Sequence, residues 1–186
     1  MRRKGVFASL AIGAVALGIA AYALAGGAGF NHLDETLIGY EEVPAVSTAG
    51  VAQFSADVSK DGNSISYTLR YSGMEGDVKQ SHIHFGQRSV NGAIIVFLCT
   101  ELGNGPAGTQ GCPDSPGQIS GTFDRDDVLC GGCTATNPVG QGIGAGEWEE
   151  LIRAIDAGKA YVNLHSDLWP GGEIRAQLNE TGNPHD

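Results

Sequence analysis

Positive charge is scarce in this sequence. Only 11 of its 186 residues are Lys or Arg, against 21 Asp or Glu, which gives a net charge of −10. Three of the basic residues, Arg2, Arg3 and Lys4, stand at the very start, so the remainder is more acidic still. An acidic surface repels nucleic acid and anionic membranes. We therefore expect no nucleic-acid partner, and membrane contact only through the N-terminal segment; the oligomeric state is left open.

Helical patterns and catalytic signature motifs are also rare. The sequence has neither the G-x-S-x-G motif of a nucleophile elbow nor a phosphate-binding loop, and it shows no internal repeat. Only residues 124–129 and 147–158 have a helical pattern, and the second segment is expected to stop at Gly158. Nothing in the sequence therefore indicates a serine hydrolase or a P-loop nucleotide enzyme.

The N-terminal segment, residues 1–25, has basic residues followed by an apolar run and ends in a small-residue motif. This order is typical of a secretory signal peptide, with cleavage after Ala25. The apolar run from Val6 to Ala25 is long, so an uncleaved membrane anchor is the alternative. Both interpretations place the domain outside the cytoplasm, as a secreted, periplasmic or surface protein.

Alternating apolar residues predict strands along most of the remaining chain. Residues 50–59 and 64–73 alternate on either side of a D-G turn, which predicts a β-hairpin. The run AIIVFLC is continuously apolar and predicts a central strand, buried on both faces. Further strands are expected at residues 117–124, 160–166 and 172–178. The sequence thus predicts one all-β antiparallel sandwich or barrel with short connecting helices at 37–179, after a linker at 26–36 and before a flexible tail at 180–186.

Four cysteines occur, and an even number in an exported protein favours disulfides. Three pairings are possible. We favour Cys99 with Cys112 and Cys130 with Cys133, because these pairs close short local loops. A four-thiolate zinc site is the alternative, although the spacing of the first pair matches zinc sites poorly.

Histidine positions give the main functional signal. In SHIHFG, Ile83 and Phe85 are core candidates, so His82 and His84 point together to the other face of the strand. The same argument places His165 on the non-core face of 160–166, with Asn163. It places Arg175 and Glu173 on the non-core face of 172–178. If these strands are neighbours, the polar side chains converge on one patch.

Three imidazoles on a rigid sheet suit copper or zinc. We predict that His82, His84 and His165 are metal ligands, with Asn163, Asp167 and Glu173 orienting the rings. Arg175 would attract a small anion to the metal. The structural alternative is that His82 and His84 are ordinary surface residues.

Three stretches resemble one known family. They are GYEEVPAVSTAGVAQF, SHIHFGQRSVNGAIIVFL and AGKAYVNLHSDLWPGGEIRAQL, which occur in this order between about Leu37 and Leu178. Together they resemble the CHRD domain family, named for its occurrence in chordin. The resemblance implies an extracytoplasmic β-sandwich of immunoglobulin-like or dismutase-like character. An insert at 101–146, which holds all the cysteines except Cys99, departs from the plainest members.

The arrangement of the candidate site is also similar to that of copper–zinc superoxide dismutase. That likeness matches His82, His84 and His165 to copper ligands and gives Arg175 the catalytic role of guiding superoxide. It implies a copper-only dismutase that takes superoxide as its small anionic substrate. Two alternatives stay open: a non-catalytic module that stores or delivers copper or binds a protein partner, and a zinc hydrolase with Glu173 as its base.

Overall fold

The computed structural model describes residues 29–179. The signal peptide or anchor at 1–25, the first residues of the linker and the tail at 180–186 lie outside this part. The elements of the described chain are the strands β1 (His32–Ile38), β2 (Val51–Val58), β3 (Ser64–Ser72), β4 (Val78–Phe85), β5 (Ala93–Thr100), β6 (Gly117–Asp124), β7 (Ala160–Ser166) and β8 (Ile174–Gln177), the helix α1 (Trp148–Asp156), and the short 3-10 helices η1 (Gly39–Glu41) and η2 (Arg125–Asp127).

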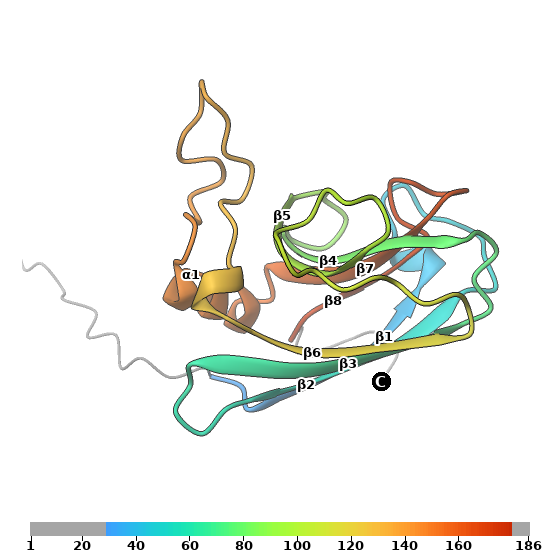
Figure 1. The fold of residues 1–186 in the computed structure, drawn as a ribbon, viewed down its shortest axis with the longest axis horizontal. Helices are drawn as coiled ribbons and strands as arrows, with labels where there is room; N and C mark the ends of the chain where they lie inside the picture. Colours follow the sequence, from blue (N-terminus) through green and yellow to red (C-terminus); the bar gives the residue numbers. More distant parts are fainter. Residues whose placement is uncertain (1–28, 180–186) are drawn as a thin grey trace, which may run out of the picture.

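All eight strands belong to one antiparallel sheet, in the order β5-β4-β7-β8-β1-β2-β3-β6. The sheet folds over so that β4, β7 and β8 form one layer and β1, β2, β3 and β6 form the other, and it is nearly closed into a barrel (Figure 1). This confirms the predicted all-β class. The β2–β3 hairpin is also confirmed, with Val58 opposite Ile65 beside the turn.

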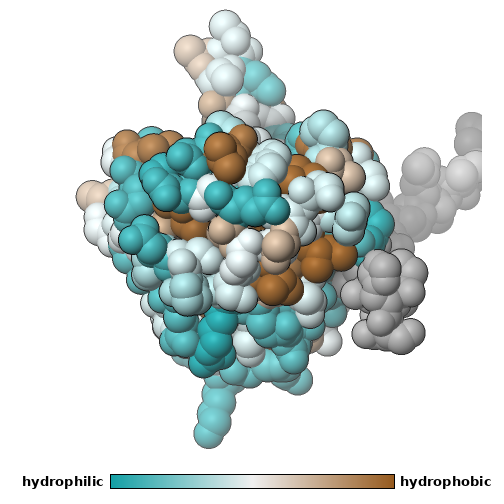
Figure 2. Space-filling view, turned by 90° about the vertical axis from the view of Figure 1, so that its right-hand side faces the viewer, coloured by the Kyte–Doolittle hydropathy of each residue, from teal (hydrophilic) through white to brown (hydrophobic). Residues whose placement is uncertain are grey.

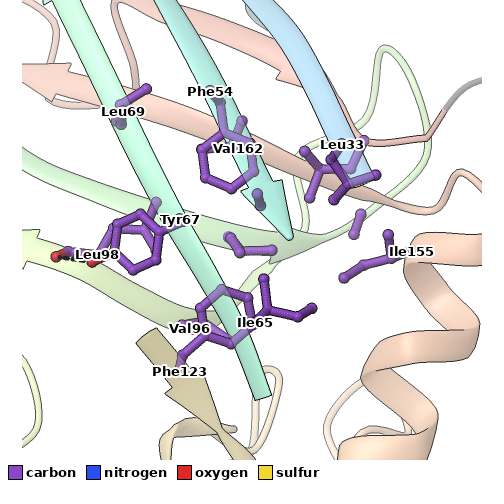
Figure 3. Packing of buried hydrophobic residues seen from close by; sticks show 14 of the residues in the cluster. Leu33, Phe54, Ile65, Tyr67, Leu69, Val96, Leu98, Phe123, Ile155 and Val162 are labelled. Atoms are coloured by element: carbon purple, nitrogen blue, oxygen red, sulfur yellow. Dashed lines mark hydrogen bonds between the residues drawn. The ribbon is translucent and has the colours of Figure 1, made fainter. Parts of the chain in front are cut away.

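The core fills the space between the two layers. Phe54, Ile65 and Leu69 from one layer and Val162 from the other are completely buried, and Figure 3 shows their side chains meeting inside the barrel. The helix α1 covers one end of this core with Ile155, which is also completely buried. The strict alternation in the sequence is therefore explained by one packed interior.

The predicted position of the strand AIIVFLC is wrong. It forms β5, which lies at one end of the strand order rather than at its centre. Side chains and loops cover its open edge: Tyr67 Oη and Gln110 Nε2 both donate hydrogen bonds to Leu98 O, and Gln110 Nε2 also reaches Ser120 O on β6. A continuous apolar run indicates burial, and here the burial comes from barrel closure instead of a second neighbouring strand.

Both favoured cysteine pairs are disulfides in the structure, Cys99–Cys112 and Cys130–Cys133, so a zinc-thiolate site is not formed. The first fastens the loop after β5 to the barrel. The second lies in the segment between η2 and α1, which projects away from the body as a long loop (Figure 1).

The sheet begins earlier in the chain than the sequence predicts. The strand β1 begins at His32, so the sheet extends into the segment 26–36 that the sequence assigned to a linker.

Within residues 29–179, no helix has the length and apolar character needed to span a membrane. Figure 2 shows apolar residues as separate patches among hydrophilic ones on the face at the right of Figure 1.

Candidate metal site

The three predicted histidines come together on the face of β4, β7 and β8 that points away from the core. These strands are direct neighbours, and the register places His82 opposite Asn163 and Asn163 opposite Arg175. His84 lies two residues from His82 on the same face, because side chains alternate along a strand. The predicted convergence of the three strands is therefore confirmed.

One ring nitrogen from each of His82, His84 and His165 lies within 4.8 Å of the others, so the three residues could hold a metal ion. His82 Nδ1 and His165 Nε2 are 3.1 Å apart. Two nitrogens bound to one ion at about 2.0–2.1 Å are separated by roughly 3.3–3.6 Å. The limit of 4.8 Å for the group is wider than this, so the three rings are near each other but are not at the spacing of a bound set.

These histidines are not surface residues. His82 is 1% exposed, and His84 and His165 are each 7% exposed. The ring of Phe97 meets the ring of His82 edge-on, with the centroids 4.4 Å apart. Loops 86–92 and 166–173 lie against the cluster, because Gly92 O is bonded to His84 and Pro170 O is bonded to His165. The alternative of two ordinary surface histidines is wrong because these loops, whose paths the sequence pattern does not show, close over the strand face.

Backbone carbonyls fix the protonation of two rings. His84 Nδ1 lies 2.9 Å from Gly92 O, and His165 Nδ1 lies 2.9 Å from Pro170 O. A carbonyl only accepts, so Nδ1 carries the proton in both rings and Nε2 carries a lone pair. This is the way in which metal-binding histidines are usually held.

The free lone pairs gather in the cluster. His82 Nε2 and His84 Nε2 are buried and have no hydrogen-bond partner. His165 Nε2 accepts a hydrogen bond from His82 Nδ1 at 3.1 Å, and it also faces Asn163 Oδ1, an amide oxygen that only accepts, at 3.0 Å. Unpaired buried acceptors are unfavourable, and a cation among them would satisfy them together. The residues present therefore fit a metal ion.

Burial keeps all three rings neutral. Burial is the main cause, and with a smaller contribution from the neighbouring histidines it lowers the pKa of His82 to about 2 and that of His84 to about 4. Burial also lowers the pKa of His165. Because a metal competes with protons for the same lone pairs, a neutral cluster is ready to bind at neutral pH without releasing protons from these nitrogens.

Of the predicted orienting residues, Asn163 reaches the cluster. Its amide also lies beside Glu42, a residue that the sequence analysis did not identify. A Cβ on Gly172 would lie 2.2 Å from Glu42 Oε1 and 2.9 Å from Asn163 Nδ2, so glycine is required beside this pair. Glu42 is buried, and burial raises its pKa to about 7 against the attraction of Arg175. Glu42 lies in a loop with no strand phase, and its only signal was its place in the motif GYEEVP.

The other two predicted orienting residues bind elsewhere in the described structure. Asp167 Oδ1 accepts a hydrogen bond from the backbone N–H of Asp77 at 2.8 Å. Glu173 Oε1 accepts from Thr48 Oγ1 and from the backbone N–H of Glu75, both at 2.8 Å. These carboxylates fasten loops to the barrel. Glu173 therefore has a structural role here, and not the role of the general base that a zinc hydrolase would need.

Arg175 lies on the predicted face but is buried, with 1% of its surface exposed. Its Nη2 donates to Gln87 O and Val90 O at 3.2 and 3.1 Å, and its Nη1 has no hydrogen-bond partner. Its guanidinium carbon lies 3.4 Å from the centre of the Tyr161 ring. An arginine in this position acts on its surroundings mainly through its charge.

Tyr161 connects Arg175 with the histidines. Its ring lies parallel to that of His84, at 2° and 4.6 Å between centroids, so His84, Tyr161 and Arg175 form a stack. The backbone of Gly92 supports two members, because its N–H donates to Tyr161 Oη and its carbonyl accepts from His84. Tyr161 has the same strand phase as Asn163 and His165, a signal that could have identified it.

Comparison with known proteins identifies one family. The family model described as CHRD domain matches residues 33–178, which include all three histidines and all eight strands except the first residue of β1. No curated protein and no solved structure matches the chain.

Proposed function

The chain belongs to the CHRD domain family, an extracellular type of domain, and we propose that it binds one copper ion through His82, His84 and His165. The observation that carries this proposal is the group of three buried imidazoles on one sheet face, two of which, His82 and His84, have an Nε2 atom without a hydrogen-bond partner. Zinc is the alternative ion, since imidazole binds both metals.

The proposal includes export. Both disulfides and the family assignment support an oxidising compartment, where cysteines stay paired. The segment 1–25 would direct export, either as a cleaved signal peptide or as a membrane anchor.

Binding of one ion is tested by titrating the purified protein with copper and with zinc, separately, and measuring bound metal after dialysis. We expect about one ion per chain, and loss of most of the binding in His84→Ala and in His165→Ala. His32→Ala is the matched control, because His32 is exposed and bonded to Asp57 on β2. Full binding by both site variants would refute the ligand assignment.

Superoxide dismutation is a second candidate, favoured by the positive charge of Arg175 beside the cluster. Bound copper would supply one-electron exchange, and two superoxide anions with two protons would give dioxygen and hydrogen peroxide. The protein's own contribution would be to hold the ion and to attract the anion. Its negative net charge opposes an anionic substrate, so the local charge of Arg175 has to dominate.

This candidate predicts that copper-loaded protein accelerates the decay of superoxide, and that Arg175→Gln slows the reaction while copper stays bound. Absence of activity in copper-loaded protein would leave the non-catalytic role, storage or delivery of copper, as the function of the site.

A further inference from the structure

We infer that the site prefers copper(I) to copper(II) and zinc, and that the buried charge of Arg175 contributes to this preference. The inference rests on the proposed copper site and specifies the oxidation state in which the ion is held. It follows from the number of donors, from their charge, and from the charge fixed behind them.

The number of donors favours copper(I). Among the His, Cys, Asp and Glu side chains of residues 29–179, the group that could hold a metal has three members, and all are imidazoles. Zinc in structural sites takes four ligands in a tetrahedron, and copper(II) favours a square-planar or tetragonal set. Copper(I) has a filled d shell with no square-planar preference, and three nitrogen donors satisfy it. The protein therefore supplies a complete set for copper(I), whereas zinc or copper(II) bound here would need water or another ligand to complete its coordination.

The charge of the ligands also favours copper(I). The three imidazoles are neutral and almost fully buried, so they cancel none of the ion's charge. The cost of removing an ion from water rises with the square of its charge, and it is large in a buried site without anionic partners. A singly charged ion is thus favoured over a doubly charged one.

The positive charge of Arg175 lies close to the cluster before any ion binds. Arg175 is held in one place by the Tyr161 ring and by two backbone carbonyls, which are neutral partners. Tyr161 in turn stacks on His84. A fixed positive charge behind a ligand repels the second charge of copper(II), and this repulsion is strong where water is excluded.

The other charged groups around Arg175 do not remove this effect. Glu42, Glu41 and Arg88 act on it electrostatically. Glu41 is bonded to Arg88, so these two opposite charges largely offset each other. Glu42 is buried, and the pKa of its carboxyl is raised to about 7, so at neutral pH it carries only part of a negative charge.

The test compares affinities in the wild-type chain. Copper(I) is presented anaerobically from a colorimetric copper(I) chelator, and copper(II) and zinc are presented from chelators of known affinity. We expect copper(I) to bind at least about a hundredfold more tightly than copper(II). At 59 mV per tenfold, this difference raises the reduction potential of the bound copper by about 118 mV relative to copper in water. Tighter binding of copper(II) or zinc would overturn the inference and leave the metal site standing, whereas no binding of any of the three ions would refute the proposed function itself.

Three variants test the part played by charge. Arg175→Gln is expected to lower the preference for copper(I) about tenfold, since it removes one unit charge from a site of low dielectric. Arg175→Lys keeps the positive charge and is expected to keep the preference for copper(I). Glu42→Gln replaces the carboxyl by a neutral amide, and it is also expected to keep this preference. An unchanged preference in folded Arg175→Gln, or a loss of preference in Glu42→Gln, would refute the role of Arg175. If Arg175→Gln does not fold, as judged by near-UV circular dichroism, Arg175→Lys and Glu42→Gln still decide it.

Discussion

At the scale of single residues, the site depends on positions where only one side chain fits. Gly92 supplies the carbonyl that holds His84 and the N–H that holds Tyr161. A Cβ at this position would lie 1.7 Å from Phe85 O, far inside van der Waals contact. One glycine therefore fixes both the ring that offers a lone pair and the ring stacked upon it.

This contact predicts the effect of Gly92→Ala. The added methyl group has to push the loop 86–92 away from β4, so we expect a loss of more than about 2 kcal/mol in the free energy of unfolding. Metal affinity should also fall in the fraction that stays folded. Gly171→Ala is the matched control: that position is open, and the change should stay within about 0.5 kcal/mol. Equal stability of the two variants in urea denaturation would contradict the account.

The buried histidines also predict the pH dependence of the metal-free protein. Their pKa values are lowered in the folded state, to about 2 for His82 and about 4 for His84, and in the unfolded chain they return to about 6.5. Between these values the unfolded state binds more protons, so stability falls as the pH is lowered from about 6.5. Glu42, with its raised pKa, works in the opposite direction.

His82 and His84 against Glu42 leave a net uptake of about one proton on unfolding, or about 1.4 kcal/mol per pH unit, and the lowered pKa of His165 adds to this uptake. We expect this loss between about pH 6 and pH 5, where ordinary carboxylates are ionised in both states. Urea denaturation of the metal-free chain at these two pH values measures it. Equal stability at both would show that the histidines are not buried as neutral rings.

At the scale of elements, strand phase was enough to predict which histidines come together. His82, His84 and His165 were assigned to one face because side chains alternate along a strand, and the order β4-β7-β8 brings them together. The same reasoning could not find Glu42, which lies in a loop, or show that Arg175 is buried, because covering loops have no periodic pattern. It also misplaced β5, since burial by barrel closure and burial in mid-sheet give the same apolar run.

The two disulfides have different expected effects on these elements. Cys99–Cys112 spans 13 residues and Cys130–Cys133 spans 3, so the first restricts the unfolded chain more. Replacing the first pair by alanines should cost about 3 kcal/mol and the second about 2 kcal/mol. The buried position of Cys99 adds to the difference. Thermal unfolding of the two double variants compares them, and a greater loss from the pair 130/133 would contradict this ranking.

At the scale of the whole molecule, the two faces of the layer formed by β4, β7 and β8 have different roles. The inner face of β4, β7 and β8 packs the core, and the outer face, covered by loops, holds a polar cluster that the core does not need for its packing. Buried polar groups without partners are costly, and a barrel of this kind would be more stable with apolar residues in their place. This cost is understandable if the cluster serves to bind a ligand.

The most direct test of this account is the metal content of the full chain, purified from an oxidising compartment without chelators. We predict about one copper per chain by elemental analysis, almost none in His165→Ala, and an unchanged content in His32→Ala. A wild-type chain that carries no metal and takes up neither copper nor zinc afterwards would contradict the account.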